Sequence, residues 1–203
     1  MPEDYLVRNC APTLAGLKTA NLFTCPYENK EALLCSIRSM NRRLGSKGLR
    51  LLPLRFSEQK ALLYLYRPAK LRQDMEDAQA SRLLQEQGYC TGNCEKCVSQ
   101  LAKKLRNQGD FPHEIGLFLG YPAEDVRGFM VYGPDCSKCT GCWKVYGDEV
   151  SARKKFDQFK KCTRVYCDQW AKGKNIDRLA VGNREPFPSV RGESSPASPA
   201  AES

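Results

Sequence analysis

The sequence predicts an α+β fold, a single globular domain over residues 1–181 in which helices pack against a mixed sheet of about four to five strands. Three observations support this fold class. The chain has 203 residues, of which 41% are hydrophobic, enough for one domain with a sizeable core. Helical and strand patterns alternate in irregular order, with one hairpin among them. The segment 182–203 is rich in Pro, Ser, Ala and Gly, and we expect a disordered tail there.

The first half of the domain contains one clear helix and one clear hairpin. Apolar residues recur at helical spacing over 29–44, and Gly45 supplies a stop signal. Two β-rich runs follow at 49–56 and 61–67, and only a short polar segment separates them. This arrangement predicts a hairpin, in which Pro53 places the first strand at a sheet edge.

The second half alternates helical patterns with short apolar runs. The run IGLFL at 115–119 is bounded by turn residues and predicts a buried strand, and Pro122 suits the first position of a short helix. The segment after 148 predicts a long basic helix. The expected elements are helices over 76–87, 95–107, 122–130 and 149–172, and strands over 115–119 and 143–146.

The most distinctive chemistry is a cluster of cysteines in the segment CSKCTGC. Cys136, Cys139 and Cys142 have the spacing C-x2-C-x2-C, which lets a loop bring successive sulfurs to one centre. Zinc and iron–sulfur clusters both take thiolate ligands, so the leading hypothesis is a metal- or cluster-binding protein serving redox or metal handling. A four-coordinate site needs one more ligand, which this segment does not contain. The alternative is three free thiols in a loop.

A second group of cysteines occurs in the segment YCTGNCEKC. Cys90, Cys94 and Cys97 share the C-x3-C-x2-C spacing of radical S-adenosylmethionine enzymes. We exclude that class because Lys96 replaces its usual aromatic residue and the chain is too short for its barrel. Asn93 is instead expected to cap the helix that follows.

Cys162 and Cys167 fall in the long basic helix. At about 100° per residue they lie roughly 140° apart around its axis, so they can hardly bind the same ion. Each is interpreted as a small buried hydrophobe or as a single ligand of a neighbouring site. The fourth ligand of a metal site is therefore one of these two, a cysteine of the Cys90–Cys97 group, or a non-protein molecule.

A rival hypothesis is a thiol enzyme, a hydrolase or transferase, that uses Cys10 and His113. His113 is the only histidine, and Pro12 with Thr13 predicts a helix beginning just after Cys10. A thiol at a helix N-terminus beside an imidazole is activated as a nucleophile. Glu114 and Asn21 are the candidates for orienting the imidazole. The alternative is that both residues are structural.

A third hypothesis is an anion- or nucleic-acid-binding module, because the chain carries a net charge of +9. No phosphate-binding glycine motif accompanies the charge, and a solvated basic face is the simpler interpretation. Partners of the protein would then be an anionic ligand or, under the metal hypothesis, a redox partner. The basic residues concerned are Arg42, Arg43, Lys47, Arg50 and Arg55 in one segment, and Arg153, Lys154, Lys155, Lys160, Lys161 and Arg164 in the other.

The sequence also bears on location. No segment approaches the roughly 20 apolar residues of a membrane helix, and the N-terminus lacks the pattern of a signal peptide. The 11 cysteines are therefore expected to be reduced thiols or metal ligands in a soluble cytoplasmic protein with no membrane partner.

Several long motifs resemble one bacterial family, the family catalogued as domain of unknown function 3793. They are CAPTLAGLKTANLF, NRRLGSKGLRLLPLR, FPHEIGLFLGYPAEDVRGFM, GCWKVYGD and FKKCTRVYC, in that order. The resemblance spans residues 5–181. It implies no activity, cofactor or catalytic residue, because members of the family are uncharacterised. The family is common in anaerobes of the clostridial type, and an anaerobic cytoplasm favours an oxygen-sensitive cluster or a reactive thiol.

Overall fold

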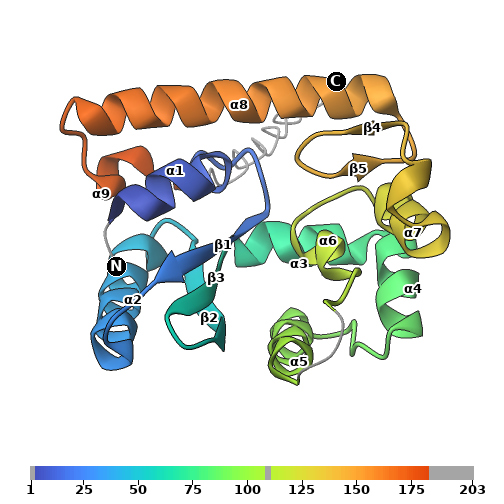
Figure 1. Cartoon of the computed structure of the whole chain (residues 1–203), viewed down its shortest axis with the longest axis horizontal. Helices are drawn as coiled ribbons and strands as arrows, with labels where there is room; N and C mark the ends of the chain where they lie inside the picture. Colours follow the sequence, from blue (N-terminus) through green and yellow to red (C-terminus); the bar gives the residue numbers. More distant parts are fainter. Residues whose placement is uncertain (1–2, 108–110, 183–203) are drawn as a thin grey trace, which may run out of the picture.

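The computed structural model describes residues 3–107 and 111–182, and it confirms the α+β class (Figure 1). Strands β1 (Ala20–Pro26), β2 (Arg50–Phe56) and β3 (Lys60–Tyr66) form a three-stranded sheet in the order β1-β3-β2. All its pairings are antiparallel. The predicted mixed sheet is therefore wrong within the described residues. Of the tail predicted over 182–203, residues 183–203 lie outside the described residues.

The predicted hairpin is confirmed as β2–β3. Pro53 lies on β2, an edge strand, where a missing backbone donor costs no ladder hydrogen bond on the open side. The register shifts between Pro53 and Arg55, which marks a bulge in that edge strand. Strand β1, which the pattern did not predict, pairs with the other side of β3.

Both faces of the sheet are buried, which explains why β3 is a nearly continuous apolar run. Leu63 and Leu65 point into one apolar cluster, with α1 (Glu3–Leu14), α2 (Lys30–Gly45) and α9 (Ile176–Leu179). Tyr64 and Tyr66 point into the other cluster. The helices on that side are α3 (Pro68–Glu76), α4 (Ala78–Glu86), α5 (Cys94–Arg106) and α6 (Ile115–Phe118).

The strand predicted at 115–119 is wrong, because this run forms the short helix α6. All four of its residues are buried, and a short buried helix has no polar face to reveal its period. Gly116 fits it against the next helix, α7 (Ala123–Tyr132). A Cβ there would lie 2.7 Å from Val126 Cγ2, so only glycine permits this close approach.

The helix expected to begin after Cys10 begins earlier. Cys10 lies inside α1, and Pro12 sits in its last turn. Residues 3–5 start α1 with two acids, Glu3 and Asp4, which suit a helix N-terminus. The cysteine is therefore not at the N-terminal end of a helix, and the dipole argument for its activation does not hold.

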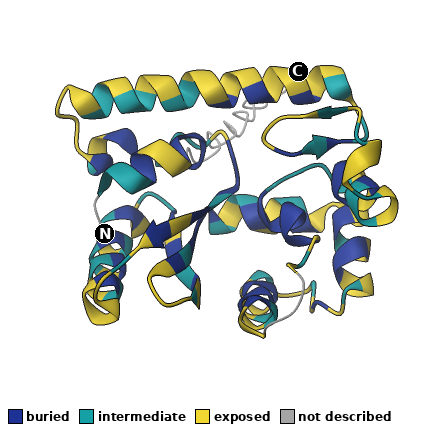
Figure 2. Ribbon diagram, in the orientation of Figure 1, coloured by how far each residue is buried: buried dark blue, intermediate teal, exposed yellow. Residues whose placement is uncertain are grey.

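Helix α8 (Glu149–Ala171) is the long basic helix that the sequence predicts. It packs on α1 toward its C-terminal end and on a small hairpin toward its N-terminal end (Figure 1). That hairpin consists of β4 (Cys139–Thr140) and β5 (Lys144–Val145) and follows the turn η1 (Pro134–Cys136). Most of the α8 surface is exposed (Figure 2).

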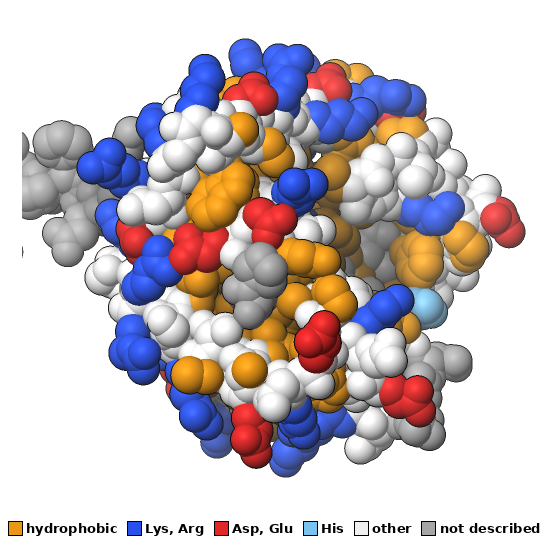
Figure 3. All heavy atoms as spheres, turned by 60° about the vertical axis from the view of Figure 1, so that its left-hand side comes forward, with side chains coloured by type: hydrophobic (Ala, Val, Ile, Leu, Met, Phe, Trp, Pro, Cys, Tyr) orange, Lys and Arg blue, Asp and Glu red, His pale blue; other side chains and the backbone are white. Residues whose placement is uncertain are grey.

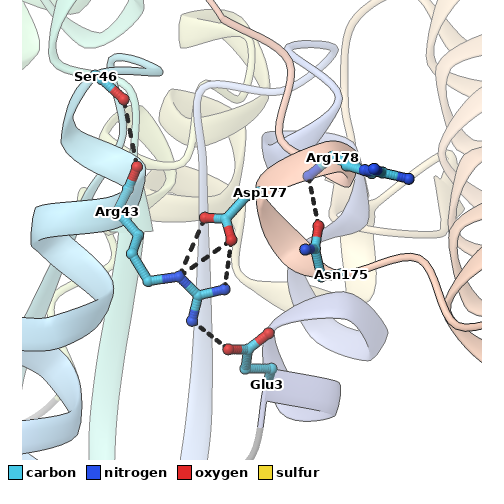
Figure 4. A network of polar contacts seen from close by, with 6 residues as sticks. All are labelled: Glu3, Arg43, Ser46, Asn175, Asp177 and Arg178. Carbon is cyan, nitrogen blue, oxygen red and sulfur yellow. Dashed lines mark hydrogen bonds and ion pairs between the residues drawn. The ribbon is translucent and has the colours of Figure 1, made fainter.

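An ion-pair network ties α2 to α1 and α9. Arg43 donates hydrogen bonds to Glu3 and to both carboxylate oxygens of Asp177, at 3.1 and 3.2 Å from its Nε (Figure 4). These bonds lower the pKa of Asp177 and raise that of Arg43. One member of the predicted basic segment, Arg43, is therefore structural.

Among the described residues, no helix combines the length and apolar character that a membrane span requires.

Candidate anion-binding cleft

A cleft of 570 Å³ opens beneath the middle of α8, between α1 and β1 on one side and the β4–β5 hairpin on the other. It collects residues from segments far apart in the chain. Its polar lining residues are Asn9, Lys18, Asn21, Cys142, Lys160, Thr163 and Arg164. Its apolar lining residues are Pro12, Leu22, Leu119, Tyr121 and Phe159. None of these described residues is acidic.

Lys18 is the unusual member of this lining, because the residue is only 8% exposed. Its ammonium lies 5.0 Å from the centre of the Tyr121 ring. Within the described part of the chain, the structure records no hydrogen bond or ion pair for the Lys18 Nζ. No fully buried side-chain nitrogen or oxygen among the described residues lacks a hydrogen-bond partner, so the Lys18 Nζ must still be reached by solvent from the cleft. An anion that enters the cleft would give this ammonium a partner.

Burial lowers the pKa of Lys18 to about 8, although the nearby thiols of Cys142 and Cys10 act in the opposite direction. The low value reflects the loss of water around the charged form. Lys18 therefore carries a charge at neutral pH that its surroundings in the protein only weakly stabilise.

The loop that carries Lys18 is fixed at its base by backbone hydrogen bonds. The Lys18 amide donates to Pro12 O at 3.1 Å, and Gly16 takes a positive φ of 75° that lets the chain turn after α1. Arg67 closes the same end of α1 by donating to Thr13 O at 2.8 Å and to Leu14 O at 2.9 Å. Lys18 is thus held in place by its neighbours and does not reach freely from the surface.

Two further cations reach the cleft from α8. Lys160 and Arg164 are one turn apart, are exposed, and take part in no recorded ion pair among the described residues. Figure 3 shows Lys and Arg side chains gathered along the top of the molecule, where α8 runs. With Lys18 they bring three cations to the cleft and no carboxylate.

The wall opposite α8 is aromatic. The Tyr121 ring stacks on Trp143 at 4.9 Å, and Trp143 meets Phe156 of α8 edge-on at 4.5 Å. The Tyr121 hydroxyl donates to Cys142 O at 3.1 Å, and burial raises the pKa of Tyr121 to about 12. The wall is therefore neutral at physiological pH and offers a flat apolar surface beside the cations.

The three cysteines predicted to bind metal have different electrostatic neighbours. Cys136 interacts electrostatically with Tyr146, Cys139 with Arg153, and Cys142 with Lys18. Among residues 3–107 and 111–182, no group of three or more His, Cys, Asp or Glu side chains is arranged to hold a metal ion. As placed here, these residues do not fit a zinc ion or a cluster. Only Cys142 reaches the cleft.

The other candidate ligands do not complete a site either. Asn93 caps α5 as predicted, by accepting from the Lys96 amide at 2.9 Å. Cys97 is buried and donates to Cys90 O at 3.2 Å, and burial raises the pKa of Cys97 and Cys94. Helix α5 lies at the opposite edge of the molecule from the β4–β5 hairpin (Figure 1). Cys162 and Cys167 on α8 are both half-buried.

The predicted pair of Cys10 and His113 is not joined by a hydrogen bond among the described residues. Cys10 is fully buried in the apolar cluster around α1, and burial raises its pKa far above that of an ordinary thiol. His113 instead meets the ring of Phe129 at 4.9 Å. Asn21 accepts a hydrogen bond from Thr13 at 2.7 Å.

Glu114, the other candidate for orienting His113, is engaged elsewhere. Its carboxylate accepts from Lys104 Nζ at 2.8 Å and from the Tyr89 hydroxyl at 2.9 Å. Burial alone would raise the pKa of Glu114, but these hydrogen bonds hold it below its usual value. The carboxylate is therefore part of a structural ion pair.

His113 lines a smaller pocket of 280 Å³, walled by aromatic side chains that include Phe129 and Trp143. The buried Asp125 at this pocket accepts from Trp143 Nε1 at 2.7 Å and from the amides of Tyr146 and Gly147. These bonds dock the β4–β5 hairpin on α7 and use both carboxylate oxygens. The Asp125 carboxylate at this pocket is therefore already hydrogen-bonded within the protein, and the cleft beneath α8 is the better candidate for binding a polar ligand.

Lys18 is the site residue that the sequence patterns did not single out. One signal for it was available, because Lys18 is the only charged residue between Arg8 and Glu28. A single charged residue in a stretch that otherwise forms a buried helix end and a strand indicates a buried ionisable group.

A family model described as "Protein of unknown function (DUF3793)" matches residues 6–180. The match covers most of the chain, so the chain belongs to this family. No curated protein and no solved structure matches the chain.

Proposed function

We propose that this protein binds a small anionic ligand in the cleft beneath α8, where Lys18, Lys160 and Arg164 surround the anion. The observation that carries the proposal is the largely buried Lys18 residue, whose ammonium lines the cleft and for which the structure records no anionic partner among the described residues. A ligand carboxylate or phosphate would supply that partner and offset the cost of burying the charge.

The dimensions and walls of the cleft favour a metabolite over a polymer. Its volume of 570 Å³ falls within the range of about 300–1,000 Å³ that is typical of small-molecule sites. The Tyr121 ring and Phe159 would cover the apolar part of such a ligand. Lys18 is too deeply buried to follow a nucleic-acid backbone along the surface, so a small anion fits better than the nucleic-acid alternative.

Calorimetric titration with inorganic pyrophosphate and with citrate tests the proposal. We expect Lys160→Ser combined with Arg164→Ser to weaken binding by at least about tenfold, because charge-assisted hydrogen bonds contribute about 1.5–3 kcal/mol each. The matched control combines Lys154→Ser with Lys161→Ser, which removes the same charge from exposed positions of α8 outside the cleft.

The control variant should retain affinity to within about twofold at 0.15 M salt, where screening weakens charges more than about 8 Å away. Equal losses of affinity in the two double variants would mean that the anion is attracted only by the overall charge of α8. That result, or heat of binding from neither anion, would contradict the proposal.

A second candidate function is metal or cluster binding by Cys136, Cys139 and Cys142. The C-x2-C-x2-C spacing supports it, as does the exposure of Cys136 and Cys142. It requires the β4–β5 hairpin to rearrange so that the three thiols converge. Anaerobic purification followed by metal analysis and a visible spectrum tests it, and a colourless protein without stoichiometric iron or zinc would contradict it.

The Cys10–His113 thiol enzyme stays a prediction from the sequence, and the burial of Cys10 does not support it.

A further inference from the structure

Lys18 combines two properties that are seldom found together in a lysine. The residue is largely buried, and it lines a cleft that is open to a ligand. Lys160 and Arg164 of α8 line the same cleft, and the titratable groups near Lys18 are Cys10, Cys142 and Tyr121. Desolvation favours the neutral, nucleophilic form of this amine, although Cys142 and Cys10 act in the opposite direction.

We propose that Lys18 acts as a nucleophilic amine and forms an imine with a small aldehyde or ketone that also carries a carboxylate or phosphate. This inference rests on the proposed function, since Lys160 and Arg164 would hold the anionic group while Lys18 meets the carbonyl carbon. The ligand class is thus narrowed from any small anion to an anionic carbonyl compound.

The arrangement divides the two tasks between the rim and the interior of the cleft. Lys160 and Arg164 are exposed on α8 at the rim of the cleft, where their cationic groups can hold an anion. Lys18 lies deeper, against the Tyr121 ring and beside the apolar lining. An anionic group at the rim therefore directs the rest of a small ligand toward the Lys18 amine.

The protonation state of Lys18 agrees with this role. With a pKa of about 8, about a tenth of the Lys18 side chains are neutral at pH 7, compared with about 0.03% for an ordinary lysine. The fraction of reactive amine is therefore several hundred times larger than at an exposed lysine, before any effect of positioning.

The reaction is a condensation without electron transfer to or from an external reagent. The nitrogen lone pair attacks the carbonyl carbon, and the π electrons of the carbonyl move to its oxygen. The carbinolamine that results loses this oxygen as water, which takes up the two hydrogens that the amine nitrogen gives up. The products are one imine and one water, and no oxidant or reductant is needed.

Pyridoxal 5′-phosphate, an anionic aldehyde, is the probe that tests this inference. The full-length protein is incubated with substoichiometric probe, reduced with borohydride, digested and analysed by peptide mass spectrometry. We expect labelling of Lys18 to exceed that of every other lysine by at least about tenfold, from its larger neutral fraction. Inorganic pyrophosphate should compete, and Lys18→Arg should abolish the labelling at this position.

Two controls separate this inference from the proposed function. The Lys160→Ser, Arg164→Ser variant should lower Lys18 labelling several-fold while labelling elsewhere is unchanged, and its folding is checked by circular dichroism. Pyridoxal, which lacks the phosphate, should label Lys18 far less than the phosphorylated probe. Labelling spread evenly over exposed lysines, while pyrophosphate still binds by calorimetry, would overturn the imine proposal alone. Equal labelling by both probes without competition would overturn the anion-binding function.

Discussion

At the scale of single residues, Lys18 illustrates how a functional group can oppose stability. Its folded-state pKa of about 8 lies below the 10.5 of a free lysine, so the folded protein binds fewer protons than the unfolded chain between these values. Stability attributable to this residue therefore rises as the pH increases from 8 to 10.5. Below pH 8 the buried charge destabilises the fold by its full amount.

We predict that Lys18→Met stabilises the protein at pH 7 by roughly 1–3 kcal/mol, because it removes a buried charge but keeps the length of the side chain. Chemical denaturation at several pH values measures the difference between the two free energies of unfolding. The advantage of the variant should shrink as the pH rises through 8 and should vanish near 10.5. A variant that is less stable than the parent at pH 7 would show that Lys18 has a structural partner.

At the scale of elements, the β4–β5 hairpin has little core of its own and depends on Asp125. Its strands have two residues each, and three hydrogen bonds to the Asp125 carboxylate fix it on α7. The same hairpin carries Cys142 and supports Tyr121 through Trp143, so it forms one side of the cleft. A change that detaches the hairpin from α7 should therefore also disrupt the cleft.

We predict that Asp125→Ala destabilises the protein by roughly 2–4 kcal/mol, because it leaves three donors without their acceptor. Trp143 fluorescence should shift to the red as the indole becomes exposed, and pyrophosphate affinity should fall. Asp135→Ala, which removes an exposed acid from the turn η1, is the control and should leave the fluorescence unchanged. Unchanged anion affinity in an Asp125→Ala protein with exposed Trp143 would show that the hairpin does not contribute to the site.

The elements also show what the sequence could predict. Helices with one polar face, such as α2 and α8, and the β2–β3 hairpin follow from their periodicity and turn residues. The run at 115–119 does not, because a short segment buried on all sides has no polar face to distinguish a helix from a strand. Strand β1 was missed for the related reason that polar and apolar residues do not alternate strictly along it.

At the scale of the whole molecule, the cleft is a product of the fold and of no single motif. Lys18 lies more than a hundred positions before Cys142 and Lys160, and the packing of α8 across α1 and the hairpin brings the three together (Figure 1). Spacing patterns reveal sites whose ligands are close in sequence, which is why the cysteine groups were conspicuous. They cannot reveal a site formed by residues that are distant in the sequence. The cysteine spacing therefore predicts a metal ligand at Cys142 and not its place in the cleft.

The charge of the assembled cleft should be detectable at Cys142. For each thiol, the rate of alkylation by iodoacetate is divided by the rate of alkylation by neutral iodoacetamide. We predict that this ratio is several-fold to about tenfold higher at Cys142 than at Cys35, an exposed thiol on α2 outside the cleft. Peptide mass spectrometry measures both rates in one sample. The preference should fall at 0.5 M salt and in the presence of pyrophosphate. The same ratio at both thiols would indicate that the cleft does not concentrate anions.

If the proposed function is correct, Lys18 is a largely buried cation whose role is to bind an anionic ligand. Calorimetric titration of pyrophosphate into the parent protein and into Lys18→Met at pH 7 tests this role. The prediction is one binding site in the parent and an affinity at least about tenfold lower in the variant, although the variant is the more stable protein. Equal affinity in the two proteins would contradict the claim.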